Sequence, residues 1–380
     1  MPPPLPDPIL IDTPKALKHL AALLMGESRL AVDTEANSLH AYHERVCLIQ
    51  FSTPRNDYLV DPLALDDMTH LAPVFSDPQI EIIFHAAEYD VIGLQRDFDF
   101  TFHNIFDTML AARTLGYKQV GLASLLAEKF GLEINKQNQK ADWGHRPLTE
   151  SLINYARLDT HYLVPLRDML EQELKEKGRW ELASEDFQRS CFVNNHHNPR
   201  SSRAAWERID GRQELTPRQL TILNELCLMR ERMAARLDRP LFKVMDDRIL
   251  LSLSQSCAHT LEDLITAGLS EKQINRFGKP LLEALRRGEQ ARLVHATELE
   301  RMPDATVSRL QKLKSWRKLK AEEMGVESDV VLPRYYMHAL AEQNPRTAGE
   351  LEKVLDGTPW RLQHYGDEIL HTLGVQQAAA

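Results

Sequence analysis

The chain has 380 residues, of which 43% are hydrophobic and 27% are charged, so it has enough apolar material for two or three globular domains. It contains no apolar run long enough to cross a bilayer, and its first residues lack the basic and apolar regions of a signal peptide, so we expect a cytoplasmic protein without membrane association. A formal net charge of -9 argues against indiscriminate binding to nucleic acid but leaves room for a local basic groove.

The first two hundred residues predict an α/β domain. Short β-rich apolar runs are separated or followed by helical patterns, and this order predicts a mixed sheet flanked by helices. The runs expected to be strands cover residues 9–11, 30–32, 46–51, 58–60 and 82–84. Around residues 192–203 the pattern gives way to Asn, His, Pro and Ser, as in a linker. We therefore expect this domain to occupy residues 1–200.

Two acids stand one residue apart where the second expected strand ends. In the run Ala31-Val32-Asp33-Thr34-Glu35, side chains two residues apart leave a strand on the same face, so the carboxylates of Asp33 and Glu35 point into one place. Crowded carboxylates repel one another unless cations hold them, and hard divalent cations prefer oxygen ligands. A lone pair of this kind is more often a solvated edge or a helix cap, so its meaning depends on further carboxylates.

The segment EIIFHAAEYD, residues 81–90, runs from an expected strand into a helix. It puts Asp90 in a first helical turn near the carboxyl edge of the sheet, where α/β proteins place ligands. The alternative for Asp90 is charge complementarity with the helix N-terminus. His85 is a candidate for contact with a phosphate or the metal shell, although a structural role in the strand-to-helix turn is favoured. Asp107 is expected to cap the helix that follows it.

A polar and basic segment, NKQNQK at residues 135–140, is expected to form a loop at the mouth of the site. Its Lys136 and Lys140 are candidates for contact with an RNA backbone, with a solvated loop as the simpler alternative. Trp143 and Arg146 follow shortly after the loop. They are candidates for base stacking and for phosphate contact, or else for packing.

Residues 152–163 carry apolar positions at helical spacing, which places Tyr155 and Asp159 one turn apart on one helix face. In this arrangement the acid can hold a cation while the phenol orients a water molecule. Alone, Tyr155 would be interpreted as an amphipathic packing residue. In the company of the three acids described above, the pair favours a metal site.

The remainder of the chain is all-helical in pattern and repeats itself. A capped helix start is expected at Leu215-Thr216-Pro217. Positions spaced along one copy recur 87 residues later, and the match resumes after a one-residue slip between 277–282 and 365–370. The pairs are Leu223 and Leu310, Leu226 and Leu313, Arg230 and Arg317, Ala234 and Ala321, Val244 and Val331, Leu253 and Leu340, Thr260 and Thr347, and Leu264 and Leu351. We therefore expect two copies of one module, at residues 208–293 and 300–374.

A basic run surrounds Trp316 in the second copy. It consists of Arg309, Lys312, Lys314, Arg317, Lys318 and Lys320, with no acid among them. One interpretation is a patch that follows phosphates beside a stacking ring. At 100° per residue, however, the cations spread around the helix, while Leu310, Leu313, Trp316 and Leu319 are expected to gather on one side. We favour a core-facing Trp316 with a solvated basic rim, whose charge remains available to steer RNA.

The motifs AVDTE, HAAEYD and YARLD resemble those of the DEDD family of 3'-to-5' exonucleases, in its tyrosine-bearing branch, and within it the ribonuclease D group. The segments 122–136 and 140–149 are similar to those that lead into the third motif. One departure is Ala-Asn-Ser at 36–38 in place of an aromatic found in some relatives, which concerns the packing of the terminal nucleotide. Each helical copy resembles an HRDC domain, and the second copy is the more divergent.

The resemblance implies a ribonuclease H-like fold and hydrolysis with two divalent ions, Mg²⁺ or Mn²⁺. On the family pattern Asp33, Glu35, Asp90 and Asp159 hold the ions, and Tyr155 positions the attacking water. Tyr155 is not expected to act as the base, because a free phenol titrates near about pH 10. The implied substrate is RNA with a free 3' end, in particular tRNA precursors and other small structured RNAs, with release of nucleoside 5'-monophosphates.

Two alternatives remain open at this stage. A single-stranded DNA 3'-to-5' exonuclease uses the same metal chemistry, because recognition of the ribose 2'-hydroxyl depends on geometry that the sequence does not give. A non-catalytic RNA-binding protein on an inactive nuclease fold is the other, and the presence of all five candidate residues argues against it. No extended coiled-coil seam is evident, so a monomer is expected.

Overall fold

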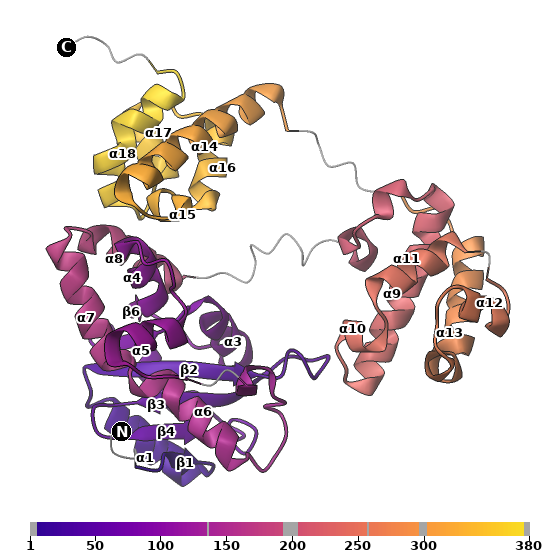
Figure 1. The fold of residues 1–380 in the computed structure, drawn as a ribbon, viewed down its shortest axis with the longest axis horizontal. Coiled ribbons are helices and arrows are strands. Elements are labelled where there is room, and N and C mark those ends of the chain that lie inside the picture. Colours follow the sequence, from indigo (N-terminus) through magenta and orange to yellow (C-terminus); the bar gives the residue numbers. More distant parts are fainter. Residues whose placement is uncertain (1–5, 135–136, 193–203, 257, 296–301, 376–380) are drawn as a thin grey trace. The chain divides into compact units, whose positions relative to one another are not determined.

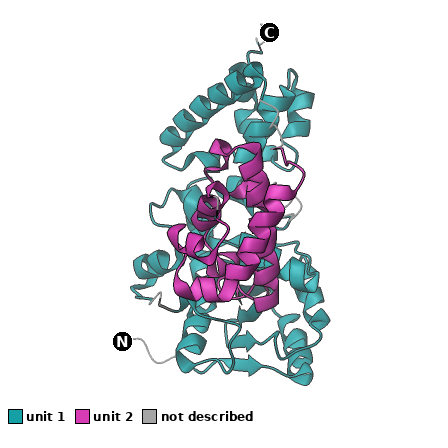
Figure 2. Cartoon of the chain, turned by 90° about the vertical axis from the view of Figure 1, so that its right-hand side faces the viewer, with its two compact units in different colours: residues 1–36, 46–193, 301–380 teal, residues 37–45, 194–300 magenta. Residues whose placement is uncertain are grey.

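The computed structural model describes residues 6–134, 137–192, 204–256, 258–295 and 302–375. The chain divides into two compact units (Figure 2). Unit 1 comprises residues 1–36, 46–193 and 301–380, and unit 2 comprises residues 37–45 and 194–300. Unit 1 thus contains the α/β domain and the second helical repeat, whereas unit 2 contains the first repeat. Within the described ranges, no helix is both long and apolar enough to span a membrane.

One mixed sheet organises unit 1. In the described part of the chain it has six strands, β1 (Ile9–Ile11), β2 (Arg29–Ala36), β3 (Val46–Ser52), β4 (Asp57–Val60), β5 (Glu81–Phe84) and β6 (Ile105–Asp107). Their order is β1-β4-β3-β2-β5-β6, and β3 runs antiparallel to both of its neighbours while the other pairs are parallel (Figure 1). The predicted mixed sheet is confirmed, with β6 in addition, a three-residue strand that was not among the predicted apolar runs.

Helices cover both faces of this sheet because alternate strand residues are apolar on both sides. Val32 packs in a core with residues of α1, α2 and α3, whereas its neighbour Ala31 packs with α4, α5, α7 and α8. On the face of Ala31, Leu48 and Leu59 pack with Ala156 of α6. The helices are α1 (Pro14–Leu24), α2 (Ala72–Ser76), α3 (Glu88–Phe98), α4 (Thr108–Leu115), α5 (Leu122–Phe130), α6 (Glu150–His161), α7 (Leu163–Glu176) and α8 (Trp180–Ser190).

Side-chain caps fix where two of these helices begin. The carboxylate of Asp107 accepts hydrogen bonds from the backbone N–H groups of Met109 and Leu110, at 2.8 and 3.1 Å, which confirms the predicted cap of α4. Thr149 Oγ1 accepts from the N–H of Leu152, at 3.3 Å, at the start of α6. Each cap satisfies N–H groups that have no partner within the helix. The start of α6 matters most, because this helix carries Tyr155 and Asp159.

The helical repeat predicted from the sequence is confirmed helix by helix. The first copy consists of α9 (Pro217–Leu237), α10 (Leu241–Val244), α11 (Asp247–Gln255), α12 (Leu261–Thr266) and α13 (Glu271–Gln290). The second consists of α14 (Asp304–Met324), α15 (Ser328–Val331), α16 (Arg334–Gln343), α17 (Ala348–Val354) and α18 (Pro359–Thr372). The long helix begins at Pro217 in one copy and at Asp304 in the other, 87 positions apart, and the last helix begins 88 positions apart, as the one-residue slip predicts.

Unit 2 also contains residues 37–45, the segment that joins β2 to β3. The Tyr42 hydroxyl donates to a carboxylate oxygen of Glu231 on α9, at 2.7 Å. The Tyr42 backbone N–H donates to Oδ1 of Asp238, at 3.0 Å, at the end of the same helix. Residues 37–45 therefore belong to unit 2, whereas the sequence predicts one continuous domain over residues 1–200.

Trp316 faces the core of the second repeat, as the sequence predicts. Its indole N–H donates to Glu368 Oε2, at 2.8 Å, and its ring lies edge-on to Tyr365. The expectation for Leu319 is wrong, because its side chain is 61% exposed. Each step of three residues turns a helix by about 300°, so Leu319 has drifted to the side opposite Leu310.

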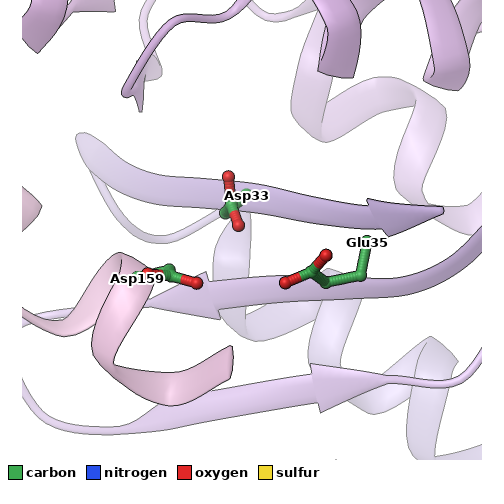
Figure 3. A group of neighbouring side chains, drawn as sticks. All are labelled: Asp33, Glu35 and Asp159. Atoms are coloured by element: carbon green, nitrogen blue, oxygen red, sulfur yellow. The ribbon is translucent and has the colours of Figure 1, made fainter. Parts of the chain in front are cut away.

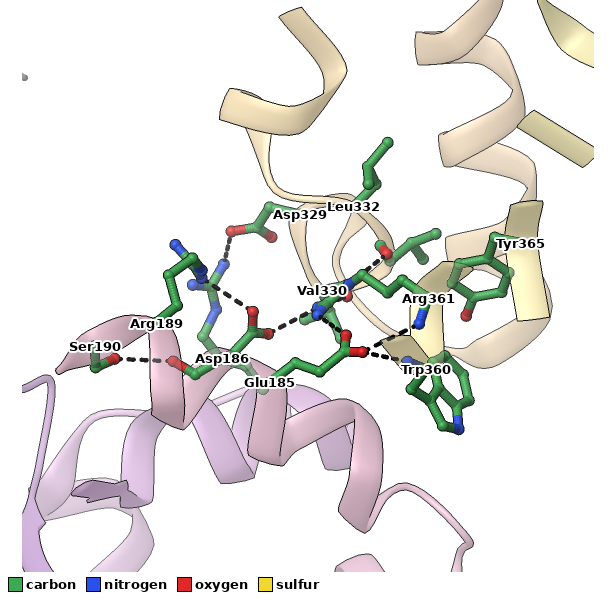
Figure 4. Close-up of polar contacts among 12 residues, drawn as sticks. Glu185, Asp186, Arg189, Ser190, Asp329, Val330, Leu332, Trp360, Arg361 and Tyr365 are labelled. Carbon is green, nitrogen blue, oxygen red and sulfur yellow. Dashed lines mark hydrogen bonds and ion pairs between the residues drawn. The ribbon is translucent and has the colours of Figure 1, made fainter. Parts of the chain in front are cut away.

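The second repeat packs on the α/β domain through a buried arginine (Figure 4). Arg361 of α18 is 0% exposed. Its guanidinium donates to Oε2 of Glu185 at 2.7 Å and to Oδ2 of Asp186 at 2.9 Å, both on α8. It also donates to the carbonyl oxygens of Val331 and Val330, at 3.1 and 2.8 Å. Every charge in this contact is therefore paired.

Close backbone approach extends the same contact to α4. Gly116, which ends α4 in the left-handed region at φ 87°, faces Gly325 so closely that a Cβ would lie 2.4 Å from the Gly325 carbonyl oxygen. Nearby, Arg179 Nη2 donates to the carbonyl oxygen of Met324, at 2.6 Å. Only glycine at position 116 permits both this turn and this approach.

Candidate metal centre

Three carboxylates from two elements meet on one face of the sheet. Asp33 and Glu35 lie on β2, and Asp159 comes from α6, which packs on that face (Figure 3). Each residue offers one carboxylate oxygen, and these oxygens lie within 4.8 Å of one another. A set of oxygen donors without nitrogen or sulfur suits Mg²⁺ or Mn²⁺. The structure thus gathers three of the four acids that the resemblance implies as metal ligands.

The fourth acid, Asp90, is fastened to the same strand. It is buried in the first turn of α3, and its Oδ1 accepts hydrogen bonds from the N–H and the hydroxyl of Thr34, at 2.9 and 2.6 Å. Thr34 stands between Asp33 and Glu35 in the chain, so these two bonds tie α3 to the centre of the acid motif. The sequence did not single out Thr34, whose role depends on a partner 56 residues away.

Burial and mutual repulsion raise the pKa values of all four carboxyls. Burial raises the pKa of Asp33 well above its usual range, and the charges of Asp90, Asp159 and Glu35 raise it further. Burial raises the pKa of Glu35 to about 9, with smaller contributions from Asp159 and Asp90. The pKa values of Asp90 and Asp159 rise to about 7, chiefly through burial. A divalent cation would reverse these shifts, so the site fits a metal ion better than it fits four bare charges.

Tyr155 keeps its proton beside these acids. Burial raises its pKa above the ordinary value, and the charges of Asp159, Glu35 and Asp33 raise it further. A hydrogen bond from its side chain favours the ionised form of Asp159 and lowers the pKa of that acid. A phenol that holds its proton donates a hydrogen bond and does not act as a base. The positioning of a water molecule by Tyr155 stays a prediction.

A polar network anchors the C-terminal end of α6 over the sheet. Ser52 Oγ on β3 donates to Oδ1 of Asp57 on β4, at 2.6 Å, and lies 2.7 Å from Thr160 Oγ1. His161 Nδ1 lies 2.9 Å from Asp57 Oδ2. Because Thr160 and His161 directly follow Asp159, these contacts fix the height and rotation of the helix that presents it. The sequence pattern did not predict this network.

The turn between β5 and α3 is also held by side chains. His85 Nδ1 lies 2.9 Å from Thr108 Oγ1, and burial lowers the pKa of His85, which favours its neutral form. Ala86 adopts a left-handed conformation, at φ 66°, and the N–H groups of Ala86 and Ala87 donate to the two carboxylate oxygens of Asp107, at 3.0 and 2.9 Å. Asp107 therefore stabilises the turn that delivers Asp90 as well as capping α4. An RNA contact at His85 stays a prediction.

Two expected RNA contacts require correction. Trp143 is 1% exposed and its ring packs against Tyr155, with centroids 6.1 Å apart, so it is not available to stack on a base. Arg146 donates to both carboxylate oxygens of Asp61, at 2.6 and 2.8 Å, and to the carbonyl oxygens of Cys47 and Trp143. Trp143 packs against Tyr155 of α6, and Arg146 holds the backbone of Trp143 in place.

The two lysines of the 135–140 loop remain candidates. Lys140 is exposed at the end of the 3-10 segment Gln137–Lys140. Lys136 lies outside the described residues. A contact of either lysine with an RNA backbone stays a prediction.

Comparison with known proteins gives a consistent result. A family model described as a 3'-5' exonuclease matches residues 8–175, and one described as an HRDC domain matches residues 219–285 and 307–373. The chain is 46% identical over 179 residues to Protein RRP6-like 3 of Arabidopsis thaliana, covering 47% of this chain and 20% of that protein. It is 28% identical over 351 residues to ribonuclease D of Pseudomonas paraeruginosa, covering 90% and 92% of the two chains.

Solved structures resemble the fold over nearly the whole chain. The crystal structure of Escherichia coli RNase D superimposes with a TM-score of 0.71 at 24% identity, covering 98% of this chain and 100% of that one. At the same time, the chain spans only 20% to 40% of the length of the first four curated relatives. Along this chain the match to the exonuclease model comes first, and the two matches to the HRDC model follow it. The chain therefore contains a 3'-5' exonuclease domain followed by two HRDC domains.

Proposed function

We propose that the protein is a divalent-metal-dependent exoribonuclease that removes nucleotides one at a time from RNA 3' ends and releases nucleoside 5'-monophosphates. The observation that carries this proposal is the meeting of Asp33, Glu35 and Asp159 within 4.8 Å of one another, in a domain of exonuclease type. The fastening of Asp90 to Thr34 beside them supports the same function, because it supplies a fourth carboxylate.

Each residue has a defined task in this function. Asp33, Glu35, Asp90 and Asp159 would hold two divalent cations, Mg²⁺ or Mn²⁺. When bound, such cations make a water molecule nucleophilic and stabilise the leaving 3'-oxygen. Tyr155 stays protonated and its hydroxyl donates to Asp159, so its oxygen would accept a hydrogen bond from the attacking water and orient it. The network of Ser52 with its partners keeps α6, and with it Tyr155 and Asp159, at a fixed distance from β2.

We infer that the substrates are tRNA precursors and other small structured RNAs with trailing 3' nucleotides, and that the enzyme acts as a monomer. The two HRDC domains support a nucleic acid as substrate, because the resemblance to that module implies contact with nucleic acid. The exposed Lys140 and the basic residues of α14 are candidates for contact with the backbone phosphates.

One assay tests the function. Purified full-length protein is incubated with Mg²⁺ or Mn²⁺ and with 3'-extended tRNA, single-stranded RNA or single-stranded DNA, each labelled at the 5' end. Stepwise 3' shortening of RNA in preference to DNA, abolished by a chelator and by Asp33→Asn, is the expected result. Preference for DNA would replace the proposal by a DNA exonuclease. If no substrate is shortened, the catalytic function is refuted and a binding role remains.

A further inference from the structure

Gln50 lies next to the candidate metal centre, although it belongs to none of the three sequence motifs. It stands in β3 directly opposite Asp33 of β2 in the antiparallel pair. Side chains of directly opposed residues project on the same face of a sheet. On the same face, Leu48 packs with Ala156 of α6, and Ser52 contacts Thr160 of α6. Gln50 is therefore buried under α6, beside the strand position that carries Asp33.

The carboxamide of Gln50 has no hydrogen-bond partner among the described residues. The side chain is 0% exposed, and neither its Nε2 nor its Oε1 meets a donor or acceptor. A buried amide without partners costs free energy, and native proteins pair nearly all such groups. On the same face of β3, Leu48 is apolar and Ser52 is paired with Asp57, so a hydrophobic residue would satisfy the fold at the position of Gln50. An amide kept at this cost points to a partner that arrives with the ligand.

We propose that Gln50 is a positioning residue of the metal centre, whose carboxamide hydrogen-bonds to the carboxylate of Asp33 when divalent cations are bound. Nε2 is a donor suited to a carboxylate oxygen, and Oε1 is an acceptor for a water molecule in the same place. Such a bond selects which oxygen of Asp33 faces the cations. Partners of this kind orient metal ligands and alter metal affinity by about 10- to 100-fold. The inference rests on the proposed metal-dependent function.

The test compares Mn²⁺ binding by full-length wild-type protein and Gln50→Met, followed by electron paramagnetic resonance of free Mn²⁺. Methionine has similar length and volume, so it removes the amide without opening a cavity. The matched control is Ile49→Met, the neighbouring residue of β3, which is equally buried on the opposite face. We expect Gln50→Met to raise the Kd for Mn²⁺ about tenfold or more and Ile49→Met to leave it within about twofold.

A second measurement separates positioning from a structural role. Without metal, Gln50→Met should melt at the wild-type temperature or above it, because an unpaired amide has been replaced by an apolar group. Its stabilisation by added Mn²⁺ should be smaller than that of wild type. Gln50→Leu gives the same comparison should the methionine variant fold poorly.

The outcomes distinguish this inference from the proposed function. An unchanged Kd in the Gln50 variants, with or without a lower melting temperature in the absence of metal, overturns the positioning role alone. Failure of the wild-type protein itself to bind Mn²⁺ refutes the metal centre, and the role of Gln50 with it. A raised Kd together with an undiminished melting temperature supports both.

Discussion

Unit 1 contains two clusters of acids, one buried and one partly buried, whose charges are balanced in different ways. Glu185 and Asp186 on α8 surround the fully buried guanidinium of Arg361, which the chain itself supplies. Asp33, Glu35 and Asp159 face one another. The charged groups that act on Asp33 and Glu35 are other acids, which raise their pKa values. The chain thus completes one cluster and leaves the other in need of an external cation.

The paired cluster around Arg361 suits a structural role, and the unpaired cluster around Asp33 suits a functional one. A buried carboxylate is tolerated when it is paired and hydrogen-bonded, as in the Arg361 contact. A group of unpaired carboxylates destabilises the fold, and it persists where binding requires it. For Glu185, burial raises the pKa while the charge and hydrogen bonds of Arg361 lower it, so the two effects oppose one another. For Asp33, burial and three neighbouring carboxylates act in the same direction.

The largest expected effect comes from replacing one acid by its amide in each cluster. Asp33→Asn should reduce turnover by roughly a thousandfold or more, because loss of a metal ligand removes several kcal/mol of transition-state stabilisation. Its metal-free melting temperature should equal or exceed that of wild type, since one repelling charge is gone. Asp186→Asn should do the opposite, keeping turnover and lowering the melting temperature. Similar behaviour of the two variants in both assays would erase the distinction between the clusters.

Arg361→Met tests the completed cluster from its cationic side. Removing the guanidinium leaves the buried Glu185 with backbone N–H partners and Asp186 with Arg189, and the loss of the buried cation should lower the free energy of unfolding by about 3–5 kcal/mol. The control is Gln273→Met at the equivalent position of α13, where the glutamine closes a capping box with Ser270, and the expected loss is about 1 kcal/mol. Urea unfolding curves measure both. Equal losses would mean that Arg361 contributes no more than a helix cap.

The pH dependence of stability should expose the incomplete cluster. In the unfolded chain, carboxyl groups ionise at about pH 4. In the folded, cation-free protein, Asp90 and Asp159 hold their protons up to about pH 7, and Glu35 holds its proton up to about pH 9. Between these values the folded state binds more protons than the unfolded state. Stability should therefore fall with rising pH, by on the order of a few kcal/mol.

Melting temperatures recorded from about pH 5 to about pH 9, with a chelator or with saturating Mn²⁺, check this expectation. Because cation binding releases protons, the stabilisation produced by Mn²⁺ should grow as the pH rises. A cation-free protein whose stability is constant over this range would show that the four carboxyls do not share an unfavourable environment.

Tyr155→Phe should give the smallest effect. It removes one hydrogen bond to the attacking water, about 1–1.5 kcal/mol, and should lower kcat roughly tenfold. Mn²⁺ should still bind, because the phenol is not itself a ligand, and the loss of its hydrogen bond to Asp159 should raise the Kd by no more than about tenfold. Single-turnover kinetics with labelled RNA and Mn²⁺ titration provide the two readouts. Unchanged kcat would remove Tyr155 from the mechanism, and Mn²⁺ binding weakened by more than about tenfold would make it part of the metal site.

Much of this protein could be predicted from local sequence patterns. Short β-rich apolar runs predicted the strands, the period of two placed Asp33 and Glu35 on one face of β2, and the period of 3.6 placed Tyr155 one turn before Asp159. The 87-residue repeat predicted two equivalent sets of helices. These features are local because backbone geometry fixes side-chain direction within a few residues.

Other features depended on partners far away in the chain. Trp143 and Arg146 were candidates for RNA contact or for packing, and the tertiary structure favours packing because it buries the first and pairs the second with Asp61. The fastening of Asp90 to Thr34 and the unpaired amide of Gln50 are equally invisible in the local pattern.

The two repeats show the division most clearly. Sequence patterns alone predicted that both copies form the same helices and that four acids and a tyrosine belong to one candidate site. Only the tertiary structure decided that the second copy packs on the exonuclease domain through Arg361, whereas the first belongs to another unit with residues 37–45. The physical reason is that helix periodicity is encoded by neighbouring residues. The neutralisation of a buried charge requires a partner that folding brings from 175 residues away.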